Sequence, residues 1–120
     1  MQQPAELKEV DGVPIVEMFG EADLANMSDL QACLSVAKGA PTRAIVVSLL
    51  HAEYFDSSTI HALVTFGEQL KGDGRRLLVV GPSGDSGRRI LSIFGLVGRI
   101  AVFDTLPKAV ASALELDARG

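Results

Sequence analysis

The residues with the clearest potential for chemistry form a run of oxygen-bearing side chains in the middle of the chain. Asp56, Ser57, Ser58 and Thr59 stand directly before an apolar pattern of helical spacing. Such residues are enriched at helix N-termini, where their oxygens accept hydrogen bonds from N–H groups that have no partner within the helix. A phosphate on a serine also suits this position, because the N–H groups and the positive end of the helix dipole favour negative charge. The run therefore predicts a helix cap, and it also offers a hydroxyl for regulatory phosphorylation.

Other candidates for catalysis or metal binding are few. His51 and His61 stand on either side of this run, and no cysteine or second carboxylate completes a metal-ligand spacing around them. Ser57, His61 and Asp56 are not a predicted catalytic triad, because no Gly-x-Ser-x-Gly elbow surrounds the serine and groups this close in one helical turn cannot adopt the geometry. We therefore expect no enzyme activity, no metal and no cofactor.

Two further segments have simpler interpretations. Residues 81–89 are rich in glycine, but no lysine follows the glycines as a P-loop requires, so we expect a turn and a helix start. Glu21 and Asp23 form a small acidic pair after a predicted strand. Paired carboxylates can act as acid and base, but in a loop they are more typical of a solvated surface or a cap.

Composition excludes several classes of protein. The chain has 120 residues, a net charge of −4, 48% hydrophobic residues, one cysteine and two histidines. This size and apolar content predict one domain, residues 1–120, with a core that needs no disulfides. The acidic balance argues against direct nucleic-acid binding. Since no apolar run approaches the length of a membrane span, and no targeting segment is visible, we expect a cytoplasmic protein without membrane insertion.

The elements that position these residues alternate between strands and helices. Asp11-Gly12 is a two-residue turn signal between two strand-like runs, and it predicts an antiparallel hairpin. The hairpin is followed by short apolar runs that resemble strands of a parallel sheet. The predicted fold is α/β with the order ββαβαβαβα and four helices. We expect strands at 7–10, 13–19, 44–47, 77–80 and 100–103, and helical patterns at 24–37, 60–70, 90–94 and 106–114.

The segments 19–24, 55–60, 91–96 and 103–109 keep a fixed order along nearly the whole chain. Together they resemble segments of STAS domains, the family of anti-sigma factor antagonists. The segment 55–60, Phe-Asp-Ser-Ser-Thr-Ile, is similar to the family's Asp-Ser-Ser/Thr-Gly motif. Segment 19–24 is similar to its Gly-Glu-Leu-Asp motif, 91–96 to its late Gly-Leu helix end, and 103–109 to the lead into its last helix. The resemblance implies a STAS fold, with the helices largely on one face of a mixed sheet.

The resemblance also implies a function. Antagonists of this family bind an anti-sigma factor that is often a serine kinase, and thereby release a sigma factor. The kinase phosphorylates the serine after the motif aspartate, which is Ser57 here, with Ser58 as the reserve acceptor. The phosphorylated form releases its partner, and a PP2C-type phosphatase resets it. The expected partner-binding residues are Glu21, Asp23, Asp56, Ser57, Ser58, Thr59 and Ala62.

One departure from the motif supports an alternative. Thr59 stands where the family has glycine. Members of the family also include scaffolds that are not phosphorylated, such as stressosome-type subunits and lipid-transport-associated subunits. A β-branched residue at the glycine position favours this second function more than a standard antagonist motif would.

Overall fold

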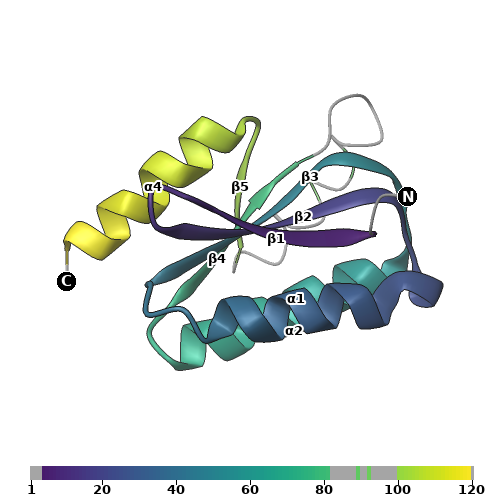
Figure 1. The fold of residues 1–120 in the computed structure, drawn as a ribbon, viewed down its shortest axis with the longest axis horizontal. Coiled ribbons are helices and arrows are strands. Elements are labelled where there is room, and N and C mark those ends of the chain that lie inside the picture. The colour runs from purple at the N-terminus through teal and green to yellow at the C-terminus, as the bar shows by residue number, and fades with distance from the viewer. Residues whose placement is uncertain (1–3, 82–88, 90–91, 93–99, 120) are drawn as a thin grey trace.

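The computed structural model describes residues 4–81, 89, 92 and 100–119. These residues form five strands and three α-helices, with one 3-10 turn at Leu24–Asn26 before the first helix (Figure 1). The predicted fourth helix, at 90–94, falls largely outside the described residues. The strands are β1 Ala5–Val10, β2 Val13–Ala22, β3 Ala44–Phe55, β4 Arg76–Val80 and β5 Ala101–Phe103, and the helices are α1 Met27–Lys38, α2 Ser57–Gly72 and α4 Leu106–Ala118.

The strands form one mixed sheet in the order β1-β2-β3-β4-β5. β1 and β2 pair antiparallel through a two-residue turn in which Asp11 and Gly12 both have positive φ, at 52° and 85°. Each later strand pairs parallel with the one before it. The predicted hairpin and the change to parallel pairing are thus confirmed.

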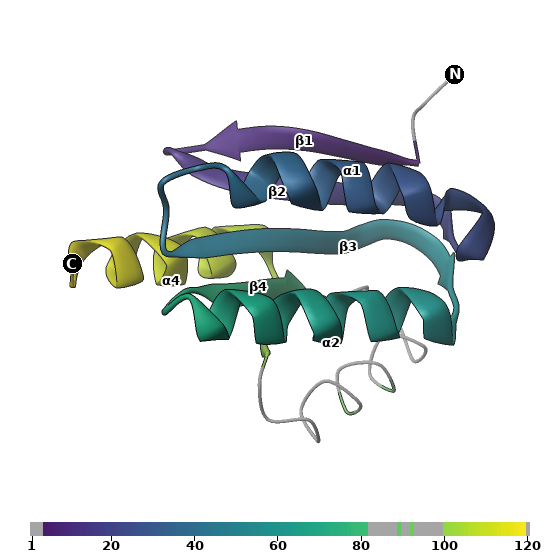
Figure 2. The ribbon, with the colours of Figure 1, turned by 90° about the horizontal axis from the view of Figure 1, so that it is seen from below.

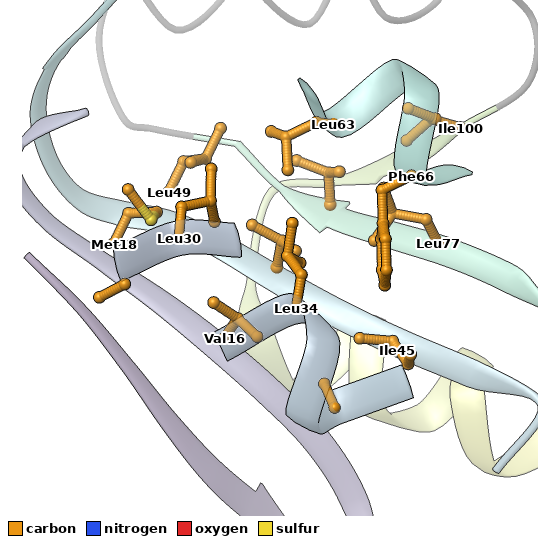
Figure 3. Packing of buried hydrophobic residues seen from close by; sticks show 14 of the residues in the cluster. Val16, Met18, Leu30, Leu34, Ile45, Leu49, Leu63, Phe66, Leu77 and Ile100 are labelled. Atoms are coloured by element: carbon orange, nitrogen blue, oxygen red, sulfur yellow. The ribbon is translucent and has the colours of Figure 1, made fainter. Parts of the chain in front are cut away.

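The helices lie on both faces of the sheet. Because each parallel strand is added on the same side of the last, right-handed crossovers place α1 and α2 on the same face, and Figure 2 shows them side by side across β3. They cover the larger core, which includes Leu34, Phe66 and Ile45 (Figure 3). α4 covers the opposite face through Ala109 and Val110. The expected one-sided arrangement therefore holds for α1 and α2 but not for α4.

Two strands run further than the sequence predicts. β2 continues through Gly20, which has a φ of 66°, to Ala22, and β3 continues through polar residues to Phe55. Register shifts between β2 and β3 fall at Glu17/Phe19 and at Gly20/Glu21. The predicted strand end at residue 19 is therefore an irregularity within a longer strand, and the extended pair of strands carries the chain to the start of α2.

The predicted helix ends agree closely with the structure. Gly39 caps α1, and Thr105, directly before the predicted helix at 106–114, accepts a hydrogen bond from Lys108 N at 3.4 Å at the start of α4. None of the helices in the described ranges is long and apolar enough to cross a membrane.

Candidate functional site

The site is built around the N-terminus of α2, which begins at Ser57 within the predicted capping run. Asp56 is the N-cap, with an extended backbone at φ −105° and ψ 177°. Its Oδ1 accepts a hydrogen bond from Thr59 N at 3.1 Å, which satisfies one of the free N–H groups of the first turn. The predicted capping function of Asp56 is confirmed.

The three hydroxyl residues after Asp56 have different environments. The Ser58 hydroxyl is half-buried and donates to Asp56 Oδ1 at 2.5 Å. Thr59 is 1% exposed, and its Oγ1 also donates to Asp56 Oδ1, at 3.3 Å. Ser57 is exposed at the first position of the helix. Of the three, Ser57 therefore offers its hydroxyl to an approaching protein most freely.

Glu21 and Asp23 lie at the same end of the sheet as Ser57, where the parallel strands β2 and β3 finish. Glu21 pairs with Tyr54 at the ends of β2 and β3, two residues before Asp56. Glu21 is exposed, whereas Asp23 is half-buried and its Oδ1 accepts from Asn26 N at 3.2 Å. Asp23 therefore helps to hold the turn before α1, and together with Asp56 these carboxylates make the surroundings of Ser57 acidic.

A groove between α1 and α2 extends from this end of the sheet. It encloses about 500 Å³, a volume typical of small-molecule or side-chain pockets. Ser58 and Ala62, both predicted partner contacts, line it from α2, and its walls carry polar groups on both helices. The full lining is Met27, Gln31, Leu34, Ser35, Lys38, Ser58, His61, Ala62, Thr65, Phe66 and Gln69.

The groove is a feature that the sequence interpretation missed. Ser58, Ala62, Thr65 and Gln69 recur at spacings of four, three and four residues, which places them along one side of a helix. Small and polar residues in such a row, beside an apolar stripe, are the sequence signal of a helix side that no neighbouring helix covers. Thr59, which is also a predicted partner contact, does not line the groove, because its side chain is buried beneath the cap.

The two histidines lie apart from each other. His61 is exposed on the groove wall, whereas His51 stacks on Phe19 with ring centroids 5.5 Å apart. His51 Nε2 also lies 3.8 Å from Glu17 Oε2, and Glu17 is buried against the sheet. Within the described part of the chain, no three residues of the metal-binding types come together. The glycine-rich segment at 82–88 lies outside the described residues.

The single cysteine belongs to the core side of α1. Cys33 packs against the larger hydrophobic cluster. Burial raises the pKa of its thiol, and the negative charges of Asp29 and Glu6 raise it further. A thiol that stays protonated is a poor nucleophile, so this cysteine behaves as a small apolar residue.

Comparison with solved structures finds the same fold in other proteins. An anti-sigma factor antagonist from Mycobacterium paratuberculosis superposes with a TM-score of 0.79 at 25% identity, covering 91% of this chain and 92% of the other. The Bacillus cell-fate determinant SpoIIAA in its phosphorylated form gives 0.67 at 22% identity, covering 90% and 97%. A sulfate transporter family protein from Wolinella succinogenes gives 0.68 at 28% identity, covering 89% and 88%.

Sequence comparison adds the family. No curated protein matches the chain. The family model of the STAS domain matches residues 4–109, which is most of the chain and includes Asp56 and Ser57. The chain therefore belongs to the STAS domain family.

Proposed function

We propose that this protein is an anti-sigma factor antagonist that binds a kinase-type anti-sigma factor and releases it when Ser57 is phosphorylated. The observation that carries the proposal is the difference between three adjacent hydroxyls. Ser57 is exposed on the first turn of α2, whereas Ser58 is bonded to Asp56 and Thr59 is buried. A kinase that must bring a hydroxyl to the γ-phosphate of ATP has its most accessible acceptor at Ser57.

Phosphorylation at Ser57 would change the surface more than the fold. It adds a charge of about −1.5 to −2 beside the Asp56 carboxylate, at a surface that already carries Glu21 and Asp23. A partner docked over Ser57 would have to desolvate that phosphate beside these carboxylates. Loss of the partner is therefore the expected effect, and a PP2C-type phosphatase would restore the binding form.

The proposed contact surface consists of Ser57 and its surroundings. Glu21 and Asp23 supply carboxylates from the end of β2, and Ser58 and Ala62 lie on the adjoining groove wall. Thr59 supports this surface from beneath rather than touching the partner directly. Because sigma factors act on RNA polymerase, the proposal places the protein in the cytoplasm of a bacterial cell, in regulation of transcription under stress.

The experiment incubates the protein with ATP and a candidate anti-sigma kinase encoded near its gene, then locates phosphate by mass spectrometry. We expect modification of the wild type at Ser57 and none in Ser57→Ala. Ser57→Asp should lose binding to the kinase, whereas Ser57→Ala should keep it. Ser28→Ala is a matched control, because Ser28 is also exposed in the first turn of a helix. Binding by Ser57→Asp as tight as that of the wild type would contradict the switch.

A scaffold that is never phosphorylated is the alternative, and the sulfate transporter relative shows that the fold also occurs in that protein family. Thr59 in place of the family's glycine suggests it from the sequence alone, although the structure buries this side chain beneath the cap. Purification from native cells separates the two functions. A small kinase recovered with the protein supports the antagonist, whereas a large assembly of STAS proteins or a transporter complex supports the scaffold.

A further inference from the structure

β1 is an edge strand whose outer side is available for pairing. It pairs with β2 and lies at one end of the sheet order. In an antiparallel pair, alternate residues bond to the partner strand. Val10 and Val13 flank the two-residue turn, and Pro4 O accepts from Phe19 N at 2.9 Å, so the even-numbered residues bond to β2. The N–H and C=O groups of Ala5, Leu7 and Glu9 therefore point outward.

Apolar side chains lie exposed along this edge. Leu7 is 38% exposed on β1, and Val36 is 66% exposed on α1. Both line one hollow of about 750 Å³ between the edge strand and the helix. Natural edge strands are commonly blunted by bulges, prolines or charged side chains. β1 has a regular register from Ala5 to Val10, and its charged residues, Glu6, Lys8 and Glu9, are of both signs, so they can oppose a like edge or pair with it according to register.

The charges on the other side of β1 are unbalanced within one chain. Glu6 lies directly opposite Glu17, and like charges in this position destabilise a strand pair. Lys8 Nζ contacts Glu17 Oε1 at 2.5 Å, and its side chain is 46% exposed. One lysine on this strand thus faces two carboxylates, and it has room to contact a further group beyond the edge.

We propose that the β1 edge binds a second copy of this chain, with the two β1 strands antiparallel and Leu7 opposite Leu7 of the second copy. The outward N–H and C=O groups of odd-numbered residues permit registers centred on residue 6, 7 or 8. Centring on residue 6 or 8 places Glu6 opposite Glu6 or Lys8 opposite Lys8. Centring on Leu7 places Glu6 opposite Lys8 of the second copy, twice by symmetry, and brings the two Leu7 side chains together on the α1 face.

This register also gives each Glu6 a positive partner, since within one chain the residue directly opposite Glu6 is Glu17. Each Lys8 would lie between Glu17 of its own chain and Glu6 of the second copy. The helices fit the arrangement as well. α1 lies over β1 and β2 (Figure 2), and with strands about 4.8 Å apart two such helices come to roughly 10 Å, the separation of packed helices. Val36 would then be covered at the contact between the two α1 helices.

The arrangement leaves the proposed partner site open. A two-fold axis through Leu7 reverses the direction of the parallel strands in the second copy. The two Ser57 residues, at the carboxyl ends of β3, would therefore lie at opposite ends of a continuous ten-stranded sheet, built from two sheets of five strands. The dimer would present two separate sites, and its existence is independent of whether Ser57 is phosphorylated.

The test exchanges charges and measures association of the full chain by sedimentation velocity over a range of concentration. Wild-type chain is expected to dimerise. Glu6→Lys alone or Lys8→Glu alone places like charges opposite each other twice, so the dissociation constant should rise roughly 10- to 100-fold. An equimolar mixture of the two single variants should form a heterodimer, because each then faces the opposite charge. The double variant carrying both changes should dimerise like the wild type.

Two controls separate the proposal from loss of folding. Glu115 is exposed on α4, so Glu115→Lys makes the same charge change as Glu6→Lys at a position away from β1. It should leave dimerisation unchanged. Leu7→Lys should be folded, since the side chain is already 38% exposed, and monomeric. A wild type that stays monomeric at every concentration, leaving the edge to a strand of another protein, overturns the proposal. Dimerisation of Glu6→Lys equal to wild type, with no gain on mixing, overturns it too.

Discussion

The strongest quantitative prediction concerns Asp56, because its carboxylate both caps α2 and lies beside the proposed phosphoacceptor. Asp56→Ala removes the acceptor of three hydrogen bonds, from Thr59 N at 3.1 Å, Ser58 Oγ at 2.5 Å and Thr59 Oγ1 at 3.3 Å. Asp56→Asn keeps a side-chain oxygen in place and removes only the negative charge. The pair of substitutions therefore separates the geometry of the cap from its charge.

The expected losses follow from these contacts. Replacing an N-cap by alanine costs about 1 kcal/mol of unfolding free energy. Loss of a negative charge at the positive end of a helix adds about 0.3–1 kcal/mol. We therefore expect Asp56→Ala to lose about 2 kcal/mol, or roughly 6–12 °C in Tm for a domain of this size. Asp56→Asn should lose about 0.5 kcal/mol, since asparagine caps nearly as well as aspartate.

Urea unfolding followed by circular dichroism measures both losses, with Thr105→Ala as the matched control. Thr105 caps α4 through one longer hydrogen bond, from Lys108 N at 3.4 Å, so its loss should be below about 1 kcal/mol. An Asp56→Ala protein with the urea midpoint of the wild type, or equal losses for alanine and asparagine, would refute the reasoning. If the prediction is confirmed, Asp56→Asn is the variant for binding assays, because it keeps the fold.

Three further predictions concern the fold around the site. Arg75 donates hydrogen bonds to the carbonyls of Thr42, Lys38 and Ala40 at 2.8–3.0 Å, so Arg75→Lys should lose about 1–2 kcal/mol in urea unfolding. Gly72→Ala should raise the free energy of unfolding by up to about 1 kcal/mol, and Tm with it, because the φ of Gly72 is not positive and a new Cβ meets no atom within 4 Å. The hydrogen bond and charge of Lys108 lower the pKa of Asp104. The contribution of this pair to the stability of the fold is therefore complete above the ordinary aspartate pKa, and it is lost as pH falls through the lowered pKa. NMR titration of Lys108→Met should return the Asp104 pKa to its usual range.

The fold was predictable because its signals are local. Asp11-Gly12 specifies the hairpin turn, and the apolar runs at β3 and β4 specify parallel strands buried on both faces. The ends of β2 and β3 were harder to predict. Gly20 and the polar residues after Leu50 indicate a loop by composition, yet the two segments pair with each other over Phe19–Ala22. That pairing depends on contacts between segments about 30 residues apart, which no local pattern contains.

The candidate site was predictable in part for the same reason. Asp56 and Ser57 follow a local capping rule, so their positions could be read from the chain. The row of small and polar residues on α2 indicates an uncovered helix side in the sequence, but the groove itself depends on the distance between α1 and α2 across β3 and needed the structure. The pairing of Glu6 with Glu17 likewise required the register of β1, since both residues look like ordinary surface carboxylates in the sequence. Features made by two segments thus needed the structure, whereas features of one turn did not.

The threonine at the motif glycine position now has a structural explanation that bears on function. A β-branched side chain directed outward there would crowd a partner or a phosphate next to Ser57. In the structure Thr59 is 1% exposed and its hydroxyl is bonded to Asp56, so the side chain lies beneath the helix cap. The surface that Ser57 presents therefore gains no bulk from the substitution, and the departure from the motif does not by itself argue against an antagonist. Thr59→Gly should then weaken the cap of α2 without opening the surface, and its binding to a kinase partner should match that of the wild type at temperatures where both are folded.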